Sequence, residues 1–576
     1  MRTGWRRWMR IWVPALLFGG LVWAHRWICD DGFIYLHVAD NLLSGLGPVF
    51  NPGERVEAYT SPLWLALISL AGAILKPVSH AGLPPFEWIA VGLGVASSIG
   101  AYAFASIGTE RLWRSGERGV PVGGLVVLGL VPFWDYGTSG LESSLVLLWL
   151  GLSFAGMVWV RDQRERPIQI LAAVCVGLGP LVRPDLGIFS LLWGLVILIG
   201  LPGWRRRLEV MACGLALPVG YEVFRMGYFA CLVPNTAIAK EAAVAAWAHG
   251  WLYFVDFETT YQIWIPLLAL GTATVWSLSH LSKASERTSV LVVAASVVGG
   301  ILQALYVIGV GGDFLHARML LPATFALALP VFTLPLREAR WFSPILIAWG
   351  IGCLLFATVR VDPEGIGLER GRLDYISESK NDHPVTDADH REMHWESATE
   401  LLEQIRGYNS TASWFFSSAN PHPLQAAELR SWVSPRIEGV AYETAVGLFG
   451  YEARQQIYVC DGYGLADPFG ARAELSRADS LTGRGKVGHE KWLQQEWCLA
   501  HLVEALNGRG RYSTAVSDLA YALVCGDLGE LYAAVDEPLS WRRFWKNVQW
   551  STRLTRLRIP TDPSETRRRF CGVTRP

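Results

Sequence analysis

The sequence contains little charge. Asp, Glu, Lys and Arg make up 18% of its 576 residues, whereas an average soluble domain contains about 25%. The 50 Lys and Arg residues are balanced by 51 Asp and Glu residues, so the chain has no overall positive field of the kind that binds nucleic acid. Heptads, solenoid repeats and low-complexity segments are also absent from the sequence, which argues against coiled coils and repeat arrays.

Apolar sequence, by contrast, is abundant. Hydrophobic residues make up 51% of the chain, and 27 residues are Trp, a type that is enriched at membrane interfaces. Apolar runs that approach the roughly 20 residues needed to cross a bilayer predict eleven membrane-spanning helices, the first of them an uncleaved anchor. These runs cover residues 11–27, 86–107, 119–134, 141–160, 168–182, 185–203, 208–224, 262–279, 288–308, 318–336 and 342–359.

Clusters of Lys and Arg predict the orientation of these helices. The clusters lie at residues 2–10, 111–118, 161–166, 204–207, 283–287 and 337–340. All of them fall on the cytoplasmic side if the shorter apolar run at 62–75 is re-entrant or interfacial. The first outer loop, residues 28–85, and the charged tail then lie outside the cell, together with the polar segments 134–142, 183–185, 234–240 and 311–318.

We therefore expect a polytopic α-helical protein of the plasma (inner) membrane. Residues 1–360 would form the membrane domain, and residues 361–576 a soluble extracytoplasmic domain with a mixed α/β or β-rich fold. Four of the nine Cys residues lie in this tail, where an oxidising compartment permits disulfides. We predict a Cys525–Cys571 bond and, less firmly, a Cys460–Cys498 bond. Zinc binding by these cysteines is the weaker interpretation, because no Cys-x-x-Cys pair occurs.

Two adjacent carboxylates, Asp30 and Asp31, directly follow the first apolar run. Because the two charges repel, one carboxyl group can have a raised pKa while the other stays ionised. Such a pair could accept a proton from a reacting hydroxyl. Acidic residues also stabilise the positive N-terminal end of a helix, so the pair could simply begin the helical stretch that follows it. Both interpretations stay open at this point.

Several motifs resemble a known class of enzymes. Residues 27–32 (WICDDG) and 47–57 (GPVFNPGERVE) are similar to the first outer loop of GT-C glycosyltransferases, which use polyprenyl-phosphate sugars. Within that class, the chain resembles the terminal β-(1→2) arabinofuranosyltransferases of mycobacterial and corynebacterial cell walls. Further similar segments occur in the same order at residues 138–143, 181–184, 224–228, 232–240, 302–306, 311–314, 464–468 and 487–491.

The resemblance implies a decaprenyl-phosphoryl-arabinofuranose donor and an acceptor at the ends of arabinan, in arabinogalactan or lipoarabinomannan. Asp30 and Asp31 would act at the reacting hydroxyl. The donor phosphate and sugar would be bound by Lys240, His316, Arg318, Asp313, Glu142 and Arg183, and the acceptor by Glu57, Tyr59, Asn235, His489 and Lys491. Each residue also has a structural explanation: cations at span ends reach the interface, acids cap helices, and Arg183 could pair with Asp185.

The mechanism and the substrate leave alternatives. In the resembling family a β-linked donor gives a β-linked product, whereas one base driving one displacement would invert the configuration. Either an aspartate acts as a nucleophile, or attack and departure share one face. We expect no obligatory cofactor, although paired acids could hold a divalent metal ion. Another polyprenyl-phosphate sugar, such as mannose, is an alternative donor. A transporter or flippase fits less well, because transporters usually show internal repeats and midplane sites.

Overall fold

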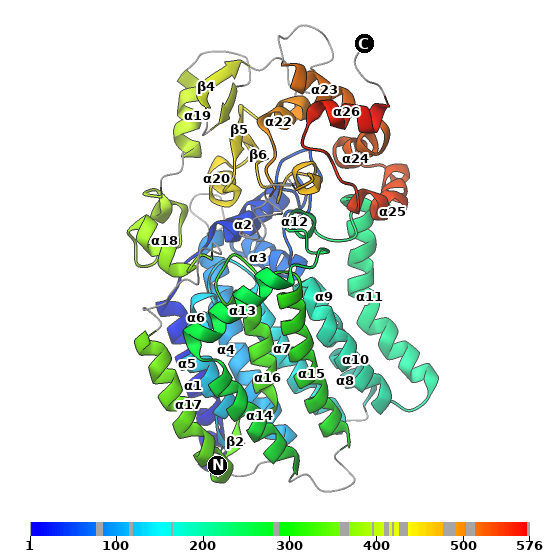
Figure 1. Cartoon of the computed structure of the whole chain (residues 1–576). Helices are drawn as coiled ribbons and strands as arrows, with labels where there is room; N and C mark the ends of the chain where they lie inside the picture. The colour runs from blue at the N-terminus through cyan, green and yellow to red at the C-terminus, as the bar shows by residue number, and fades with distance from the viewer. Residues whose placement is uncertain are drawn as a thin grey trace.

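The computed structural model shows a bundle of helices topped by a smaller domain (Figure 1). The N-terminus lies at the end of the bundle farthest from this domain, which contains the C-terminal residues. The structure describes residues 2–76, 85–113, 119–162, 165–279, 287–356, 368–393, 397–407, 414–417, 420–425, 436–475, 491–502 and 513–572.

The bundle and its outer loops are almost entirely helical. Their elements are α1 (Arg2–Ala24), α2 (Asp30–Leu43), α3 (Pro62–Leu75), α4 (Phe86–Leu112), β1 (Gly119–Val120), α5 (Val122–Gly129), α6 (Pro132–Asp135), α7 (Ser143–Asp162), α8 (Arg166–Gly177), α9 (Gly179–Val182), η2 (Pro184–Leu186), α10 (Gly187–Gly200), α11 (Trp204–Tyr228), α12 (Asn235–Ala239), α13 (Trp247–Tyr261), α14 (Trp264–Ser279), α15 (Arg287–Gly309), η3 (Arg318–Leu320), α16 (Leu321–Ala328), η4 (Leu329–Val331), β2 (Leu334–Pro335) and α17 (Leu336–Phe356).

Several of these helices are suited to a bilayer. Among the described residues, α4, α7, α15 and α17 are long and apolar enough to cross a membrane, and α13 with α14 forms a fifth candidate, bent by 87°. Five shorter apolar helical segments accompany them, at Trp8–Ala24, Pro62–Leu75, Arg166–Val182, Pro184–Gly200 and Arg318–Val331. The chain is thus a mostly helical protein with several apolar helices that indicate membrane association. The count of eleven spans stays a prediction.

Three of the predicted spans are not continuous helices. Residues 119–134 form β1, the eight-residue α5 and the start of α6, and residues 318–336 are divided among η3, α16, η4 and β2. Between α8 and α9 the helix breaks before Pro180. Prolines explain these interruptions, because the ring removes a backbone donor and disfavours a helical residue before it. The expectation of one uninterrupted helix in each run was wrong here.

The first outer loop carries two short helices with clear start signals. Helix α2 begins with Asp30 and Asp31 in its first turn, where negative charge is favourable. Helix α3 has Pro62 at its first turn, and the Ser61 hydroxyl accepts a hydrogen bond from the Trp64 amide at 3.2 Å, a typical N-cap. The run at 62–75 is therefore a 14-residue helix, about 21 Å long, shorter than the roughly 30 Å core of a bilayer.

The C-terminal part combines helices with a small sheet. Its elements are α18 (Arg372–Ser379), η6 (Asp387–His390), α19 (Ala398–Gly407), β3 (Trp414–Ser417), β4 (Asn420–Gln425), β5 (Gly439–Glu443), α20 (Val446–Ala453), β6 (Ile457–Asp461), η7 (Gly470–Arg472), α22 (Gln495–Leu502), α23 (Thr514–Ala522), α24 (Gly526–Asp536), α25 (Trp541–Thr555) and α26 (Pro563–Cys571). The strand order is β4-β3-β5-β6, in which β4 pairs antiparallel with β3 and the other pairs are parallel.

The C-terminal domain packs closely against the bundle. Helix α20 lies against α2 so tightly that a Cβ at Gly447 would come 1.8 Å from the Asp30 backbone oxygen, which only glycine permits. Helix α25 lies against α11, where the Asn547 side chain donates to the Gly227 carbonyl at 2.9 Å. Two disulfides, Cys460–Cys498 and Cys525–Cys571, link elements within the domain; these are the two pairs expected from the sequence.

Candidate active site

A cavity of about 170 Å³ lies where the loops of residues 28–85 and 234–246 meet the ends of the bundle helices. Helices α2 and α12, which contribute to its wall, lie between the bundle and the C-terminal domain (Figure 1). The charged and polar side chains that line it are Asp31, Tyr35, Tyr59, Thr60, Glu142, Arg183, Asp185, Thr236, Lys240, Tyr306, Asp313 and Arg318. Segments distant in sequence thus bring these polar side chains together in one chamber, whose lining also includes apolar residues such as Ile34, Leu141 and Met319.

Asp31 and Lys240 face each other in this cavity. The Lys240 ammonium lies 3.6 Å from a carboxylate oxygen of Asp31, and their side chains are 24% and 17% exposed. The same ammonium lies 5.2 Å from the centre of the Phe314 ring, a position that favours a cation. Asp31 comes from the first turn of α2, and Lys240 directly follows α12. The cavity wall therefore presents a carboxylate and an ammonium group close to each other, and solvent reaches both of them.

Two arginines in the cavity are held by aspartates. Arg318 Nε donates a hydrogen bond to Asp313 Oδ2 at 2.6 Å. Arg183 donates one hydrogen bond to each carboxylate oxygen of Asp185, at 2.6 and 2.8 Å. Gln303 adds a hydrogen bond to Asp185 at 3.1 Å. Pairing of this kind compensates much of the cost of burying charge and fixes the direction of each guanidinium. The alternative that Arg183 pairs with Asp185 is confirmed, and Arg183 lines the cavity as well.

Glu142 is positioned by a residue that sequence reasoning missed. The Tyr35 hydroxyl donates to Glu142 Oε2 at 3.0 Å and accepts a hydrogen bond from the Ser61 amide, also at 3.0 Å. Tyr35 lies four residues after Asp31 on α2, so both side chains share one face of the helix. This spacing is the signal in the sequence that could have identified Tyr35.

The Asp30 side chain contacts helix α20 and does not line the cavity. Its two carboxylate oxygens accept hydrogen bonds from the backbone amides of Gly447 and Leu448, at 3.1 and 2.7 Å, in the first turn of α20. Burial raises the pKa of Asp30 to about 7, the two N–H bonds oppose this rise, and the charge of Asp31 adds to it. Asp30 is not among the residues that line the cavity. The geometry thus gives the two neighbouring aspartates different surroundings.

Comparisons with known proteins identify the family of the chain. Residues 387–569 match the AftB family C-terminal domain. The chain is 32% identical to the terminal β-(1→2)-arabinofuranosyltransferase of Mycobacterium tuberculosis, over 96% of each chain. It is 31% identical to the protein of the same name from Corynebacterium glutamicum, over 95% of this chain and 85% of the relative. No solved structure matches significantly.

The chain belongs to the terminal β-(1→2)-arabinofuranosyltransferase family. Seven of the thirteen site residues expected from the sequence line the cavity of this arabinofuranosyltransferase family member: Asp31, Tyr59, Glu142, Arg183, Lys240, Asp313 and Arg318. They come from loops and from helix ends at the side of the bundle that faces the C-terminal domain. The expected site residues in the C-terminal tail are not among them.

Three of the remaining expected residues join the outer loops to other parts of the protein. Glu57 forms a buried ion pair with Arg225 of α11, at 2.6 Å. Asn235 donates to the carbonyl oxygens of Gly464, Leu465 and Asp467 at 3.0 to 3.1 Å. Lys491 lies 2.6 Å from Glu241 and also donates to the Ile238 carbonyl at 3.1 Å. Their contacts in the structure are with protein groups rather than with the cavity.

His316 belongs to a buried cluster beside the cavity wall. Its Nδ1 is bonded to the Asp256 carboxylate, and its Nε2 lies 3.3 Å from the Tyr261 hydroxyl. Arg318, two residues further on, reaches the cavity instead. The last of the thirteen, His489, lies outside the described residues.

Proposed function

We propose that this protein transfers arabinofuranose from decaprenyl-phosphoryl-arabinofuranose to the ends of cell-wall arabinan, forming β-(1→2) linkages. Family membership over nearly the whole chain supports the reaction. The observation that carries the assignment of the site is the contact between Asp31 and Lys240 in a chamber that also contains Arg318 and Arg183. Such a chamber offers cations for a leaving phosphate and acids for sugar hydroxyls.

Lys240 and Arg318 bind the donor phosphate in this proposal. Departure of a lipid phosphate develops negative charge, which preorganised cations stabilise more strongly in the transition state than in the ground state. Arg318 is already oriented by Asp313, and the Lys240 ammonium can move from Asp31 to a phosphate on its flexible stem. Binding of the donor would then release Asp31 from its ion pair at the moment when its charge is needed.

Asp31 acts at the reacting centre, and Asp30 positions it. Asp30 fixes the start of α2 against α20 through its two backbone hydrogen bonds, which sets the direction of the next side chain. Asp31 then either accepts the proton of the acceptor hydroxyl or attacks the anomeric carbon. Asp185 and Asp313 are bound by arginines, whereas Glu142 contacts Tyr35. A double displacement with net retention would therefore use Asp31 and Glu142 as its two carboxyl groups.

The active site faces the extracytoplasmic side in this proposal. The bundle end that contains the N-terminus and its Arg residues lies away from the C-terminal domain (Figure 1), as the positive-inside rule requires for an outer domain. The cavity lies at the opposite end, beside the domain. Arabinan would approach from that side, and the domain, residues 361–576, would contribute to acceptor binding.

Transfer by the purified protein tests the proposal. The full chain is given synthetic polyprenyl-phosphoryl-arabinofuranose and a short arabinan acceptor, and the linkage of the product is determined by NMR. We expect β-(1→2)-linked arabinofuranose, strong loss of transfer in Asp31→Asn, and retained transfer in Glu57→Gln as the control. Transfer of mannose alone from the matching polyprenyl-phosphate donor would refute the arabinofuranose assignment, and undiminished transfer by Asp31→Asn would refute the role of Asp31.

A further inference from the structure

A second cavity lies at the end of the bundle that contains the N-terminus, away from the C-terminal domain (Figure 1). Its volume is about 940 Å³, and residues of α7, α8, α10, α11 and α15 line it. It shares no lining residue with the candidate active site. The proposed transfer reaction uses none of these residues, so this arginine-lined cavity needs an explanation of its own.

The cavity wall combines two basic segments that are distant in sequence. Arg161 and Arg166 belong to the first segment, and Arg205 and Arg206 to the second. The positive-inside rule explains why each segment lies at this end of the bundle. It does not require the two segments to meet around one cavity. Their meeting therefore indicates a binding function in addition to an orientation signal.

Arginines outnumber carboxylates in this wall. Glu209 is the one acidic residue among the described residues of the lining, and it pairs with both Arg166 and Arg206. Arg205 lies over the Trp204 ring, 5.5 Å from its centre, and forms no ion pair with any described residue. One carboxylate cannot neutralise three guanidinium groups. The wall thus has an excess of positive charge, which favours an anionic ligand.

The wall becomes apolar one helical turn further into the bundle. Met157 lies one turn before Arg161 on α7, and Val196 and Ile197 lie one turn before the end of α10 at Gly200. All three apolar side chains line the same cavity as the arginines. The change from basic to apolar wall follows the order of phosphate and acyl chain in a phospholipid.

Exposed tryptophans give the depth of the cavity in a membrane. Trp159 of α7 is 51% exposed and Trp204 of α11 is 66% exposed, and each is next to a lining residue in sequence. Tryptophan side chains are enriched at the level of the lipid headgroups. Large apolar side chains of α10 and α11, namely Leu195, Ile199 and Leu208, are also exposed nearby in sequence. The cavity therefore lies at the level of lipid phosphates, beside surfaces suited to acyl chains.

We propose that the arginine-lined cavity binds the headgroup of one anionic glycerophospholipid. Its phosphate would be bound by Arg166 and Arg205, because a guanidinium group binds phosphate through paired hydrogen bonds. Basic pockets between membrane helices select anionic lipids in this way. A free phosphate ion would leave the apolar turn of the wall uncovered, and the polyprenyl donor reacts in the other cavity. The bound lipid connects α8, α10 and α11 to α7 and stabilises this end of the bundle.

Lipid binding measured by native mass spectrometry tests this proposal. The full chain is freed of lipid in detergent and titrated with phosphatidylglycerol or phosphatidylcholine that have the same acyl chains. We expect the wild type to bind phosphatidylglycerol at least tenfold more tightly. Replacing Arg166 and Arg205 together by Gln should remove most of this preference, because each cation near an anionic lipid contributes a factor of about five in affinity.

A second double variant, Arg337→Gln with Arg340→Gln, is the matched control. It removes two exposed arginines from the start of α17, at the same end of the bundle but outside the cavity lining. This variant should keep the preference for phosphatidylglycerol. Equal affinity of the wild type for the two lipids would overturn the proposal. An equal loss of phosphatidylglycerol binding in both double variants would overturn it too, because overall charge would then explain the preference.

Two measurements on the wild type complete the test. Phosphatidylglycerol should raise its Tm by several degrees, whereas millimolar inorganic phosphate should not; a rise with phosphate and none with the lipid would overturn the proposal. A photoreactive phosphatidylglycerol should label peptides of α7, α8, α10 or α11, and this result does not depend on the folding of any variant. Labelling confined to other helices would contradict the assigned cavity.

Discussion

Replacing Asp31 and Asp30 by Asn, one at a time, should separate chemistry from domain docking. Asp31 lies 3.6 Å from Lys240 in the cavity, whereas Asp30 accepts two backbone hydrogen bonds from α20. A correctly placed proton acceptor contributes a factor of about 10² to 10⁴ in rate, which corresponds to roughly 3 to 5 kcal/mol of barrier. We expect Asp31→Asn to lose turnover by that factor while its Tm stays near that of the wild type.

The effect on donor binding should have the opposite direction. At 3.6 Å and an effective dielectric constant of about 20, the attraction between Asp31 and Lys240 is roughly 4 to 5 kcal/mol before screening by solvent and salt. Donor phosphate must compete with this attraction. Asp31→Asn removes the competitor, so the KM for the donor should stay unchanged or fall while kcat collapses. A loss in kcat without a rise in KM is typical of an interaction made in the transition state.

Asp30→Asn should show the reverse pattern. One of its two amide partners loses an acceptor, which costs about 1 to 3 kcal/mol of unfolding free energy. At pH 5.5 we expect a Tm lower by several degrees and, in the folded enzyme, kcat within about tenfold of the wild type. Transfer is measured in nanodiscs with synthetic donor at saturating acceptor, and Tm by intrinsic fluorescence. The reasoning is refuted if Asp31→Asn turns over normally, or if Asp30→Asn is inactive with an unchanged Tm.

Three further outcomes are expected. Because the pKa of Asp30 is about 7 in the fold against 3.8 ordinarily, the folded state holds an extra proton between these values. Stability should therefore fall as pH rises from about 4 to 7, and Asp30→Asn should flatten this slope by up to about 1.4 kcal/mol per pH unit in chemical denaturation. Glu57→Gln should lower the unfolding free energy by about 1 to 3 kcal/mol, because it removes one of the two carboxylates that pair with the buried Arg225 and leaves only Glu222. The kcat of the folded fraction should stay within about threefold of the wild type, and a collapse of kcat would return Glu57 to the acceptor site. Replacing Cys525 and Cys571 by Ser should cost about 4 kcal/mol by chain entropy for a separation of 46 residues, and an unchanged Tm would show that the bond does not form.

Much of the cavity could be predicted because topology brings its parts together. Asp31, Glu142, Arg183 and Arg318 occur at the ends of different apolar runs, and Lys240 in a loop between two of them; all run ends and loops on one side of a membrane lie at the same surface. The prediction needed only the direction of each run, which the distribution of Lys and Arg supplied. Tyr35 was not predicted because it carries no charge, although it lies on the same helical face as Asp31.

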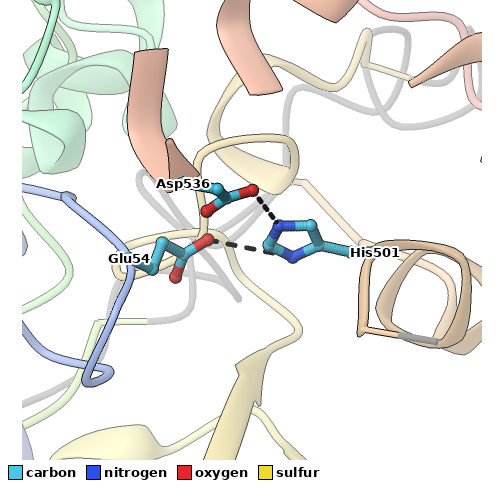
Figure 2. A group of neighbouring side chains, drawn as sticks. All are labelled: Glu54, His501 and Asp536. Carbon is cyan, nitrogen blue, oxygen red and sulfur yellow. Dashed lines mark hydrogen bonds and ion pairs between the residues drawn. The ribbon is translucent and has the colours of Figure 1, made fainter. Parts of the chain in front are cut away.

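The different surroundings of Asp30 and Asp31 could not be predicted, because they depend on contacts between distant parts of the chain. Asp30 is separated by 417 residues from its partner Gly447, and no local pattern reveals such a contact. The same distance hides the buried contacts of His501 with Glu54 and Asp536 (Figure 2). Helix interruptions were missed for a simpler reason: hydropathy measures apolar character, and it does not register the prolines that break the helix.

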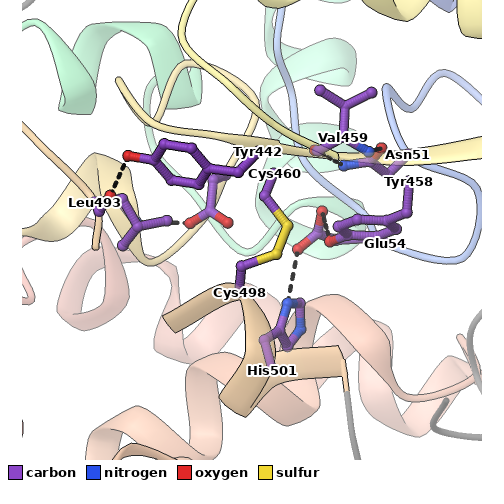
Figure 3. Close-up of a disulfide and its surroundings, with 11 residues drawn as sticks. Asn51, Glu54, Tyr442, Tyr458, Val459, Cys460, Leu493, Cys498 and His501 are labelled. Atoms are coloured by element: carbon purple, nitrogen blue, oxygen red, sulfur yellow. Dashed lines mark hydrogen bonds and ion pairs between the residues drawn. A yellow bond between two sulfur atoms is a disulfide. The ribbon is translucent and has the colours of Figure 1, made fainter. Parts of the chain in front are cut away.

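The outer loop between Asn51 and Tyr59 connects these observations. The Asn51 side chain is hydrogen-bonded to β6 (Figure 3), and the Arg55 side chain to the end of α24, so the C-terminal domain holds the loop at two points four residues apart. Tyr59, which follows, lines the cavity. A reacting hydroxyl must be held within a few tenths of an ångström of its productive position, and a wall built on a loose loop could not do this. We therefore expect the C-terminal domain to support transfer by stiffening the cavity wall, to which it also contributes Leu465.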